Sequence, residues 1–153
     1  MFSILIPTYN NLQYLKICID SIKKNSKLDH QIIVHVNEGI DGSLDFVKKS
    51  GYDFSYSEKN IGMPKALNKA SLLAKKNYLV ISHDDFYYCP GWDTEFLNEI
   101  NFINHNNFYL SGTMVGAGQI EFDAGYTSET FNEQKLLDNQ KKIQTFNFQG
   151  STK

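Results

Sequence analysis

The sequence contains no arginine, because all fifteen of its basic residues are lysine. A phosphate bound by this protein must therefore be held by lysine, by backbone amides or by a metal ion, and not by a guanidinium group. The formal net charge is −2, so the chain has no overall positive field that would hold nucleic acid through its phosphates. We expect no nucleic-acid partner.

Cysteine and long hydrophobic runs are also scarce. Cys18 and Cys89 lie far apart and form no C-x-x-C pair, which is typical of reduced intracellular thiols rather than of a disulfide framework or a zinc site. The first apolar run, Phe2–Ile6, is too short for a signal sequence, and no run approaches the roughly 20 residues of a membrane span. These features predict a cytoplasmic protein without a transmembrane segment, which could still lie peripherally at a membrane.

Short apolar runs alternate with segments of helical periodicity. The runs predict strands at 2–6, 31–36, 53–57, 78–82 and 107–118, and Pro7 is expected to end the first of them. Helices are predicted at 12–22, capped by Asn10 or Asn11, at 43–49, capped by Ser43, and at 64–74, 92–100 and 131–143. Strands that alternate with helices indicate parallel β-α-β units, with helices on both faces of the sheet.

Polar segments follow each of the first four predicted strands. They read "PTYNN", "NEGIDGS", "EKNIGMPK" and "SHDDF". In an open parallel sheet, ligands bind beyond the carboxyl ends of the strands. Any one of these segments taken alone is better explained as a turn, because Asn, Asp, Gly and Pro are turn residues. Four of them at the same edge favour a binding site.

The last of these segments places two adjacent carboxylates, Asp84 and Asp85, after His83. Paired carboxylates can hold a divalent cation such as Mg²⁺ or Mn²⁺. The alternative is that they only cap the turn before Pro90. A His-Asp pair also occurs in metal-dependent phosphohydrolases, but those enzymes need further histidines on helices. The remaining histidines of this chain lie in strand-like or loop contexts, typical of packing or surface positions.

Four motifs in order carry a family resemblance: "ILIPTYNN", "IIVHVNEGIDGS", N-x-G-x-x-x-A-x-N at 60–68, and "HDD" followed by "PGW". The chain resembles glycosyltransferase family 2, whose members have the GT-A fold and use nucleotide-sugar donors. The resemblance implies a Rossmann-like α/β/α arrangement of three layers around a mainly parallel sheet, lacking the C-terminal acceptor-binding part. It implies one domain over 1–153, with a donor-binding core at 1–107 and the truncated start of an acceptor-side region at 108–153.

The resemblance also implies a set of donor-binding residues. They are Pro7, Thr8, Tyr9, Asn10, Glu38, Asp41, Asn60, Gly62, Lys65 and Asp84. The first four resemble the family's nucleoside-binding turn. Glu38 or, as second choice, Asp41 stands where the family has an acidic residue near the base and ribose. Asn60 and Gly62 resemble the loop bordering the base and the sugar phosphates, with Lys65 as a nearby cation.

The segment His83-Asp84-Asp85 matches the family's D-x-D motif. Asp85 is then the main ligand of a divalent cation, Mn²⁺ or Mg²⁺, with His83 as a second ligand and Asp84 near the ribose or donor sugar. His83 departs from the family pattern by replacing the first aspartate. Histidine suits Mn²⁺ better than Mg²⁺, so Mn²⁺ is preferred or fewer protein ligands hold the ion. A second departure is Asn37-Glu38-Gly39-Ile40 after the second strand, where the family commonly has Asp-Asp or Asp-Gly-Ser.

The implied activity is transfer of a hexose from a UDP- or GDP-sugar to the hydroxyl of a glycan, lipid-linked or protein acceptor, as in polysaccharide biosynthesis. The catalytic base that such an enzyme needs is not found in the sequence. Glu121, Asp123 and Glu129 are better interpreted as solvated loop charges. The alternative function is a non-catalytic GT-A module that binds a nucleotide or nucleotide sugar or is structural, or an inactive fragment.

Overall fold

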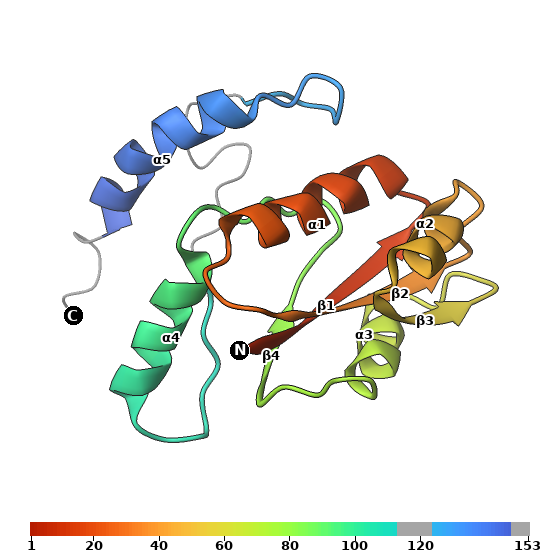
Figure 1. The fold of residues 1–153 in the computed structure, drawn as a ribbon, viewed down its shortest axis with the longest axis horizontal. Coiled ribbons are helices and arrows are strands. Elements are labelled where there is room, and N and C mark those ends of the chain that lie inside the picture. The colour runs from red at the N-terminus through yellow and green to blue at the C-terminus, as the bar shows by residue number, and fades with distance from the viewer. Residues whose placement is uncertain (113–123, 148–153) are drawn as a thin grey trace. The chain divides into compact units, whose positions relative to one another are not determined.

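The computed structural model describes residues 1–112 and 124–147. The chain divides into two compact units, Met1–Asp93 and Thr94–Lys153, and the sheet with its covering helices belongs to the first (Figure 1). The expected boundary of a donor-binding core at residue 107 remains a prediction.

In the described part of the chain, four parallel strands form one sheet in the order β3-β2-β1-β4. The strands are β1 (Phe2–Tyr9), β2 (Gln31–Asn37), β3 (Asp53–Ser57) and β4 (Tyr78–Ile81). In the register of the sheet, Leu5 of β1 pairs with Ile33 of β2 on one side and Ile81 of β4 on the other. The predicted α/β class with a mainly parallel sheet is confirmed.

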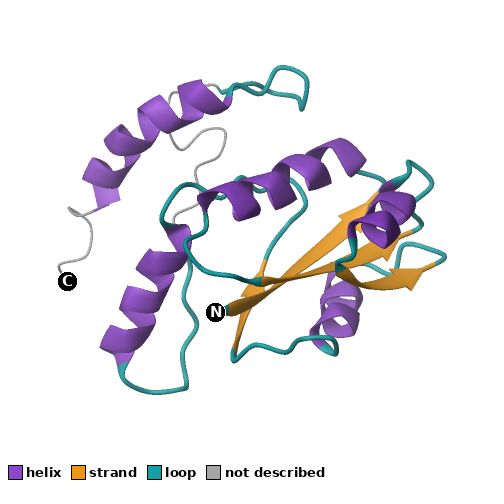
Figure 2. Cartoon of the chain, viewed as in Figure 1, coloured by secondary structure: helices purple, strands orange, loops and turns teal. Residues whose placement is uncertain are grey.

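Helices cover both faces of this sheet (Figure 2). They are α1 (Leu12–Asn25) and α2 (Ser43–Ser50) on one face and α3 (Met63–Ser71) on the other. Ala66 and Ala70 of α3 are four residues apart and fully buried, and Ala70 packs with Leu5 and Ile33 of the sheet. Their small side chains let α3 approach the sheet closely. The apolar face predicted for α1 is likewise buried, so the three-layer arrangement is confirmed.

Two further helices follow the sheet. They are α4 (Trp92–Ile103) and α5 (Glu133–Asn147). The first two residues of α4 belong to the first unit, where Trp92 Nε1 donates to Ser26 Oγ at 3.1 Å and Asp93 Oδ2 accepts from Lys27 N at 2.8 Å. The strand expected at 107–118 does not form over 107–112, and its remainder lies outside the described residues. Within 1–112 and 124–147, no helix is both long enough and apolar enough to span a bilayer.

Pro7 does not end the first strand, contrary to the expectation from the sequence. β1 continues through Pro7 to Tyr9 and stays paired with β2 over that length. The carbonyl of Leu5 accepts a hydrogen bond from Ser82 N at 3.0 Å, so the polar backbone groups of Leu5, and of Pro7 two residues later, face the β4 side. Since β4 ends at Ile81, the hydrogen-bond ladder on that side stops before it would need the N–H that proline lacks.

The cap of α2 differs in position from the prediction, and the predicted cap of α1 differs in its hydrogen bonding. Ser43 is the first residue of α2, and its N-cap is Gly42, whose φ of 92° lies in the left-handed region that glycine tolerates. Asn11 is the N-cap of α1, but its side chain makes no capping hydrogen bond. Asp41 supplies that bond from a distant loop, because its Oδ2 accepts from Leu12 N at 2.6 Å. Asp41 therefore joins the start of α1 to the start of α2.

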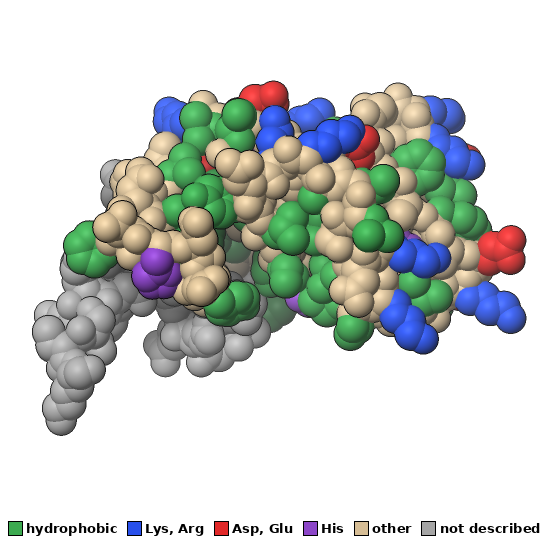
Figure 3. All heavy atoms as spheres, turned by 90° about the horizontal axis from the view of Figure 1, so that it is seen from below, with side chains coloured by type: hydrophobic (Ala, Val, Ile, Leu, Met, Phe, Trp, Pro, Cys, Tyr) green, Lys and Arg blue, Asp and Glu red, His purple; other side chains and the backbone are tan. Residues whose placement is uncertain are grey.

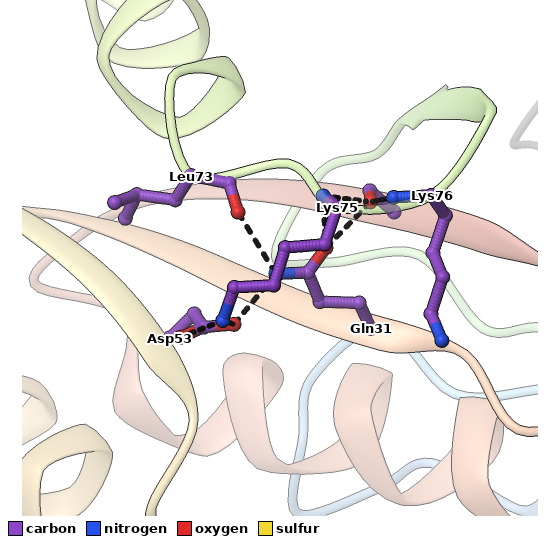
Figure 4. Close-up of polar contacts among 6 residues, drawn as sticks. Gln31, Asp53, Leu73, Lys75 and Lys76 are labelled. Atoms are coloured by element: carbon purple, nitrogen blue, oxygen red, sulfur yellow. Dashed lines mark hydrogen bonds and ion pairs between the residues drawn. The ribbon is translucent and has the colours of Figure 1, made fainter.

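A cluster of polar contacts fastens the amino ends of the strands to the loop between α3 and β4 (Figure 4). Gln31 Nε2 donates to Asp53 Oδ2 at 2.6 Å and to the carbonyl of Leu73 at 2.9 Å, while Gln31 Oε1 accepts from Lys75 N at 2.8 Å. Lys75 Nζ also lies 3.1 Å from Asp53 Oδ2. This cluster closes the amino edge of the sheet and leaves the loops of the carboxyl edge to form a site.

Lysine side chains lie among hydrophobic and uncharged ones on the face drawn in Figure 3. Two lysines place their ammonium groups over aromatic rings. Lys16 Nζ lies 5.6 Å from the ring centroid of Phe46, and Lys23 Nζ lies 4.9 Å from that of Tyr52. Each is a cation–π contact between α1 and the α2 region. These two lysines therefore stabilise the helical layer, which is a role other than binding an anion.

Candidate functional site

A cavity of about 460 Å³ opens at the carboxyl edge of the sheet. Its lining residues are Pro7, Thr8, Tyr9, Asn10, Asn11, Asn37, Asn60, Gly62, Met63, His83 and Asp84. They come from the ends of β1 and β2, the loop before α3 and the loop after β4. This is where the sequence predicts a ligand, because loops that follow parallel strands converge on one edge.

The cavity brings together most of the predicted site residues. Those that line it are Pro7, Thr8, Tyr9, Asn10, Asn60, Gly62, His83 and Asp84. Four others, Glu38, Asp41, Lys65 and Asp85, lie outside its lining. The last residue of β2, Asn37, lines the cavity, and neither of the acidic residues expected in the following loop does.

Thr8 and Asp84 form the main polar contact inside the cavity. Thr8 is buried near the end of β1, and its Oγ1 donates to Asp84 Oδ2 at 2.7 Å. This hydrogen bond links β1 to the loop between β4 and α4 (82–91), although the two residues are far apart in sequence. We call this loop, which carries Asp84 and Asp85, the acidic loop. The bond orients one carboxylate oxygen of Asp84 toward β1.

The environment of Asp84 disfavours its charge. Burial raises the pKa of this carboxyl above its usual value, and the charge of Asp85 adds to the effect. Hydrogen bonds from the side chains of Thr8 and Asn11 and from the backbone of Tyr9 act in the opposite direction without cancelling the shift. A cation bound beside Asp84 would relieve this cost, because an opposite charge favours the ionised form.

His83 and Asp85 flank Asp84 in different settings. His83 lines the cavity, and its ring stacks on Phe86 with the centroids 4.8 Å apart. Asp85 is exposed to solvent and lies outside the cavity lining. The backbone of this loop turns back on itself, since Phe86 N donates to the carbonyl of His83 at 3.4 Å.

The acidic loop fits a divalent cation that is held partly by a substrate. Within the described residues, no group of three His, Cys, Asp or Glu side chains is placed to hold a metal ion by itself. A Mg²⁺ or Mn²⁺ ion at a nucleotide site needs only one or two carboxylates, because phosphate oxygens and water complete its coordination. Asp84 and Asp85 provide such a pair, of which Asp84 lines the cavity and Asp85 is exposed to solvent.

Glu38 and Asp41 support the site from outside the cavity lining. Glu38 Oε2 accepts from Asn10 Nδ2 at 3.2 Å, and Asn10 Oδ1 accepts from Ile40 N at 3.0 Å, so this loop fixes the amide of Asn10. Burial opposes the ionisation of Asp41, but hydrogen bonds from Ser43 and Leu12 outweigh it and lower the pKa of this carboxyl. Asp41 is thus a charged helix cap in this structure.

The loop before α3 brings a helix N-terminus to the cavity. Asn60 Oδ1 accepts from Gly62 N at 2.9 Å, and Gly62, with φ 77°, is the N-cap of α3. The N-terminus of a helix presents backbone N–H groups and a positive partial charge, which suit a phosphate. Lys65 lies in the first turn of α3 and is exposed, outside the cavity lining.

Asn37 lines the cavity but is not among the donor-binding residues predicted from the sequence. It is 3% exposed, its Nδ2 donates to the carbonyl of Thr8 at 3.3 Å, and its Oδ1 accepts from Ser57 Oγ at 3.1 Å and Ile61 N at 3.0 Å. Asn37 thus ties the ends of β1, β2 and β3 to the loop before α3. Its position as the first polar residue after the apolar run of β2 could have indicated this role. Asn11 and Met63 were missed as well.

The network continues into the sheet through His35, which is fully buried. Because Ser57 Oγ donates to Asn37, it accepts from His35 Nε2 at 3.1 Å, and His35 Nδ1 then accepts from Ser55 Oγ at 2.7 Å. Burial lowers the pKa of His35, and the charge of Lys69 lowers it further. His35 is therefore a neutral histidine within the packed sheet, as expected for a packing position.

The parallel sheet with its polar carboxyl edge defines the class of protein as an α/β protein with a ligand site at the strand ends. TarS of S. aureus, solved as residues 1–349 in complex with UDP, matches with a TM-score of 0.59 and 25% identity over 66% of this chain and 32% of that one. The mannosyltransferase PcManGT of Pyrobaculum calidifontis, solved with GDP-Man and Mn²⁺, matches with a TM-score of 0.55 and 18% identity over 68% and 32% of the two chains. The fold is that of GT-A glycosyltransferases.

The family model described as glycosyl transferase family 2 matches residues 3–152, so the chain belongs to glycosyltransferase family 2. An uncharacterized glycosyltransferase of Rickettsia bellii is 33% identical over 120 residues, which are 73% of this chain and 17% of the relative. The chain spans between 17% and 32% of the length of the curated relatives that it matches. The resemblance found in the four sequence motifs is confirmed.

Proposed function

We propose that this chain is the donor-binding part of a glycosyltransferase that transfers a hexose from a UDP- or GDP-sugar to an acceptor hydroxyl. The observation that carries the proposal is the cavity at the carboxyl edge of the sheet, with Thr8 hydrogen-bonded to Asp84 in its wall. Family membership supports the reaction class, and the UDP complex of TarS supports a nucleotide donor.

The donor lies between the end of β1 and the loop before α3 in this proposal. Thr8, Tyr9 and Asn10 contact the nucleoside, on the turn that starts with Pro7. Glu38 acts through its hydrogen bond to Asn10, and Asp41 through the cap of α1. These two contributions are indirect, because neither carboxylate lines the cavity.

The pyrophosphate lies toward the N-terminus of α3. Asn60 and Gly62 border it there, and the helix N-terminus supplies N–H groups to an anion. Lys65, in the first turn of the same helix, adds a positive charge outside the cavity. The sequence has no arginine, so these groups would hold the phosphates together with a cation bound at the acidic loop.

Asp85 is the main ligand of a divalent cation, Mn²⁺ or Mg²⁺, with His83 as a second ligand and Asp84 toward the ribose or donor sugar. When bound, such a cation stabilises the negative charge that develops on the leaving nucleoside diphosphate. Asp85 lies outside the cavity lining and is exposed, so its carboxylate is accessible to an ion from solvent. Asp84 is held by Thr8 and keeps a fixed orientation.

The acceptor is a glycan, a lipid-linked sugar or a protein, as in polysaccharide biosynthesis. We do not propose Glu121, Asp123 or Glu129 as the catalytic base. Glu129 is exposed, and Glu121 and Asp123 lie outside the described residues. The second candidate function is a binding module without transfer activity, favoured by the presence of His83 where the motif has aspartate.

Calorimetry with UDP, GDP, CDP and dTDP, each with and without Mn²⁺, tests the proposal. We expect UDP or GDP to bind and Mn²⁺ to strengthen the binding. Absence of binding by all four nucleotides in the presence of Mn²⁺ would refute a nucleotide-sugar site. Binding of a nucleotide combined with neither hydrolysis nor transfer of the matching sugar, across a panel of acceptors, would favour the binding module.

A further inference from the structure

The acidic loop is attached to one face of α1 at both of its ends. Cys18, Ser21 and Asn25 lie on that face, since spacings of three and four residues bring side chains to the same side of a helix. They are 0%, 2% and 7% exposed. Buried polar groups need hydrogen-bond partners. The partners of these three residues lie largely in the segment from His83 to Gly91.

The first attachment is at the carbonyl of His83. Cys18 Sγ donates to this oxygen at 3.3 Å, and Ser82 Oγ donates to it at 3.1 Å. The same oxygen accepts from Phe86 N at 3.4 Å, which closes the turn that contains both aspartates. The start of the acidic loop is thus held by α1 and by its own turn.

The second attachment is at Tyr88. Its N–H donates to Ser21 Oγ at 2.9 Å, and its carbonyl accepts from Asn25 Nδ2 at 2.7 Å. Asn25 also donates to the Tyr87 hydroxyl at 3.1 Å, and its own carbonyl accepts from Gly91 N at 3.3 Å. Two neighbouring turns of α1 therefore hold both backbone polar groups of one loop residue.

Only four residues separate His83 from Tyr88, and Asp84 and Asp85 are two of them. With both ends fixed, the backbone beneath the carboxylates has little freedom to move. We propose that Ser21 and Asn25, assisted by Cys18, are positioning residues that hold the two carboxylates in place for a cation and the donor pyrophosphate. This inference rests on the proposed function, and none of the three residues lines the cavity.

Two substitutions test the attachment at Tyr88. Ser21→Ala removes the acceptor of the Tyr88 N–H, and Asn25→Leu removes both side-chain donors while keeping a side chain of similar size. Val47→Ala is the matched control, because Val47 is fully buried in α2 and its truncation destabilises the fold without touching the acidic loop. Any effect shared with Val47→Ala reflects stability alone.

The first measurement is amide hydrogen exchange at Tyr88 in the protein without ligand. We expect exchange at this amide to be at least about tenfold faster in Ser21→Ala and Asn25→Leu, beyond any change in core amides such as that of Ile33. Val47→Ala should alter exchange without singling out Tyr88. Unchanged protection of Tyr88 in both variants would overturn the inference.

The second measurement is the Mn²⁺ concentration that half-saturates the binding of UDP and, separately, of GDP. Loss of groups that orient metal ligands typically costs 10- to 100-fold in metal affinity, so we expect a rise of about that size in the two variants. Binding of nucleotide without Mn²⁺ should stay unchanged. A rise no larger than that in Val47→Ala would contradict the positioning role. If the wild-type protein binds neither nucleotide, the proposed function fails, and exchange at Tyr88 still decides whether α1 holds the loop.

Discussion

The hydroxyl of Thr8 donates a 2.7 Å hydrogen bond to Asp84 Oδ2, and this bond joins the central strand to the acidic loop. Asp84 is otherwise disfavoured as a charged group, because burial and the neighbouring charge of Asp85 raise its pKa. The Thr8 bond is one of the interactions that keep the carboxylate in place despite that cost. The pair therefore connects the fold directly to the proposed chemistry of the cavity.

Thr8→Val keeps the size of the side chain and removes the donor. A hydrogen bond to a charged group contributes about 1.5–3 kcal/mol, so we expect the Kd for UDP or GDP with Mn²⁺ to rise by about tenfold or more. Thr8→Ser is the control, because it retains the hydroxyl and should bind nearly as well as the wild type. Calorimetry on the three proteins makes the comparison. A loss in Thr8→Ser as large as that in Thr8→Val would contradict the role of the hydrogen bond, because Thr8→Ser retains the donor.

Asp85→Asn removes the charge of the proposed main metal ligand. Because Asp85 is exposed, we expect the free energy of unfolding to change by no more than about 0.5 kcal/mol. Metal-dependent nucleotide binding should be abolished, which calorimetry with and without Mn²⁺ would detect. Survival of the Mn²⁺ effect in this variant would mean that Asp85 is not the ligand.

Asp84→Asn should stabilise the fold while weakening Mn²⁺-dependent nucleotide binding. A carboxyl with a raised pKa holds its proton more tightly in the folded than in the unfolded state, so its ionisation at neutral pH lowers stability. This loss is absent below the unfolded pKa near 3.8, develops as the pH rises from there toward the higher folded pKa, and is complete above it. The advantage of Asp84→Asn in urea unfolding should therefore be larger at pH 7.5 than at pH 4.5. A variant less stable than the wild type at pH 7.5 would contradict the assignment.

Gln31→Leu and Lys75→Met separate stability from binding at the amino edge. Gln31 makes hydrogen bonds to Asp53, Leu73 and Lys75, so its replacement should cost about 1–3 kcal/mol of unfolding free energy. The Lys75 side chain is 68% exposed, and an exposed ion pair such as Lys75–Asp53 contributes at most about 1 kcal/mol. Urea unfolding measures the loss of unfolding free energy in each of the two variants. Nucleotide binding should be unchanged in either variant, and a binding defect would place the ligand elsewhere.

The sequence predicted the order and type of the strands and helices of the first unit because apolar periodicity decides those elements. Pro7 shows the limit of local rules. Its tolerance within β1 depends on β4 ending at Ile81, which no segment of sequence near Pro7 records. Asp41 shows the same limit, because it caps a helix that begins 29 positions earlier in the chain.

The location of the site was predictable because loops after parallel strands share one edge, and most of the expected residues line the cavity there. Which residue of a loop faces inward was less predictable. Asn37 turns its amide into the strand network, while Glu38, with φ 60°, lies outside the cavity lining. The hydrogen bonds of α1 to the acidic loop link residues more than 60 positions apart, and they follow only from the packed structure.

A crystal structure of the protein with Mn²⁺ and UDP, or GDP if that nucleotide binds more tightly, tests the central claim most directly. We predict the nucleoside against Thr8 and Asn10, the pyrophosphate near Gly62 and the cation on Asp85. A nucleotide bound away from the carboxyl edge of the sheet, or a cation with no contact to the acidic loop, would contradict this account.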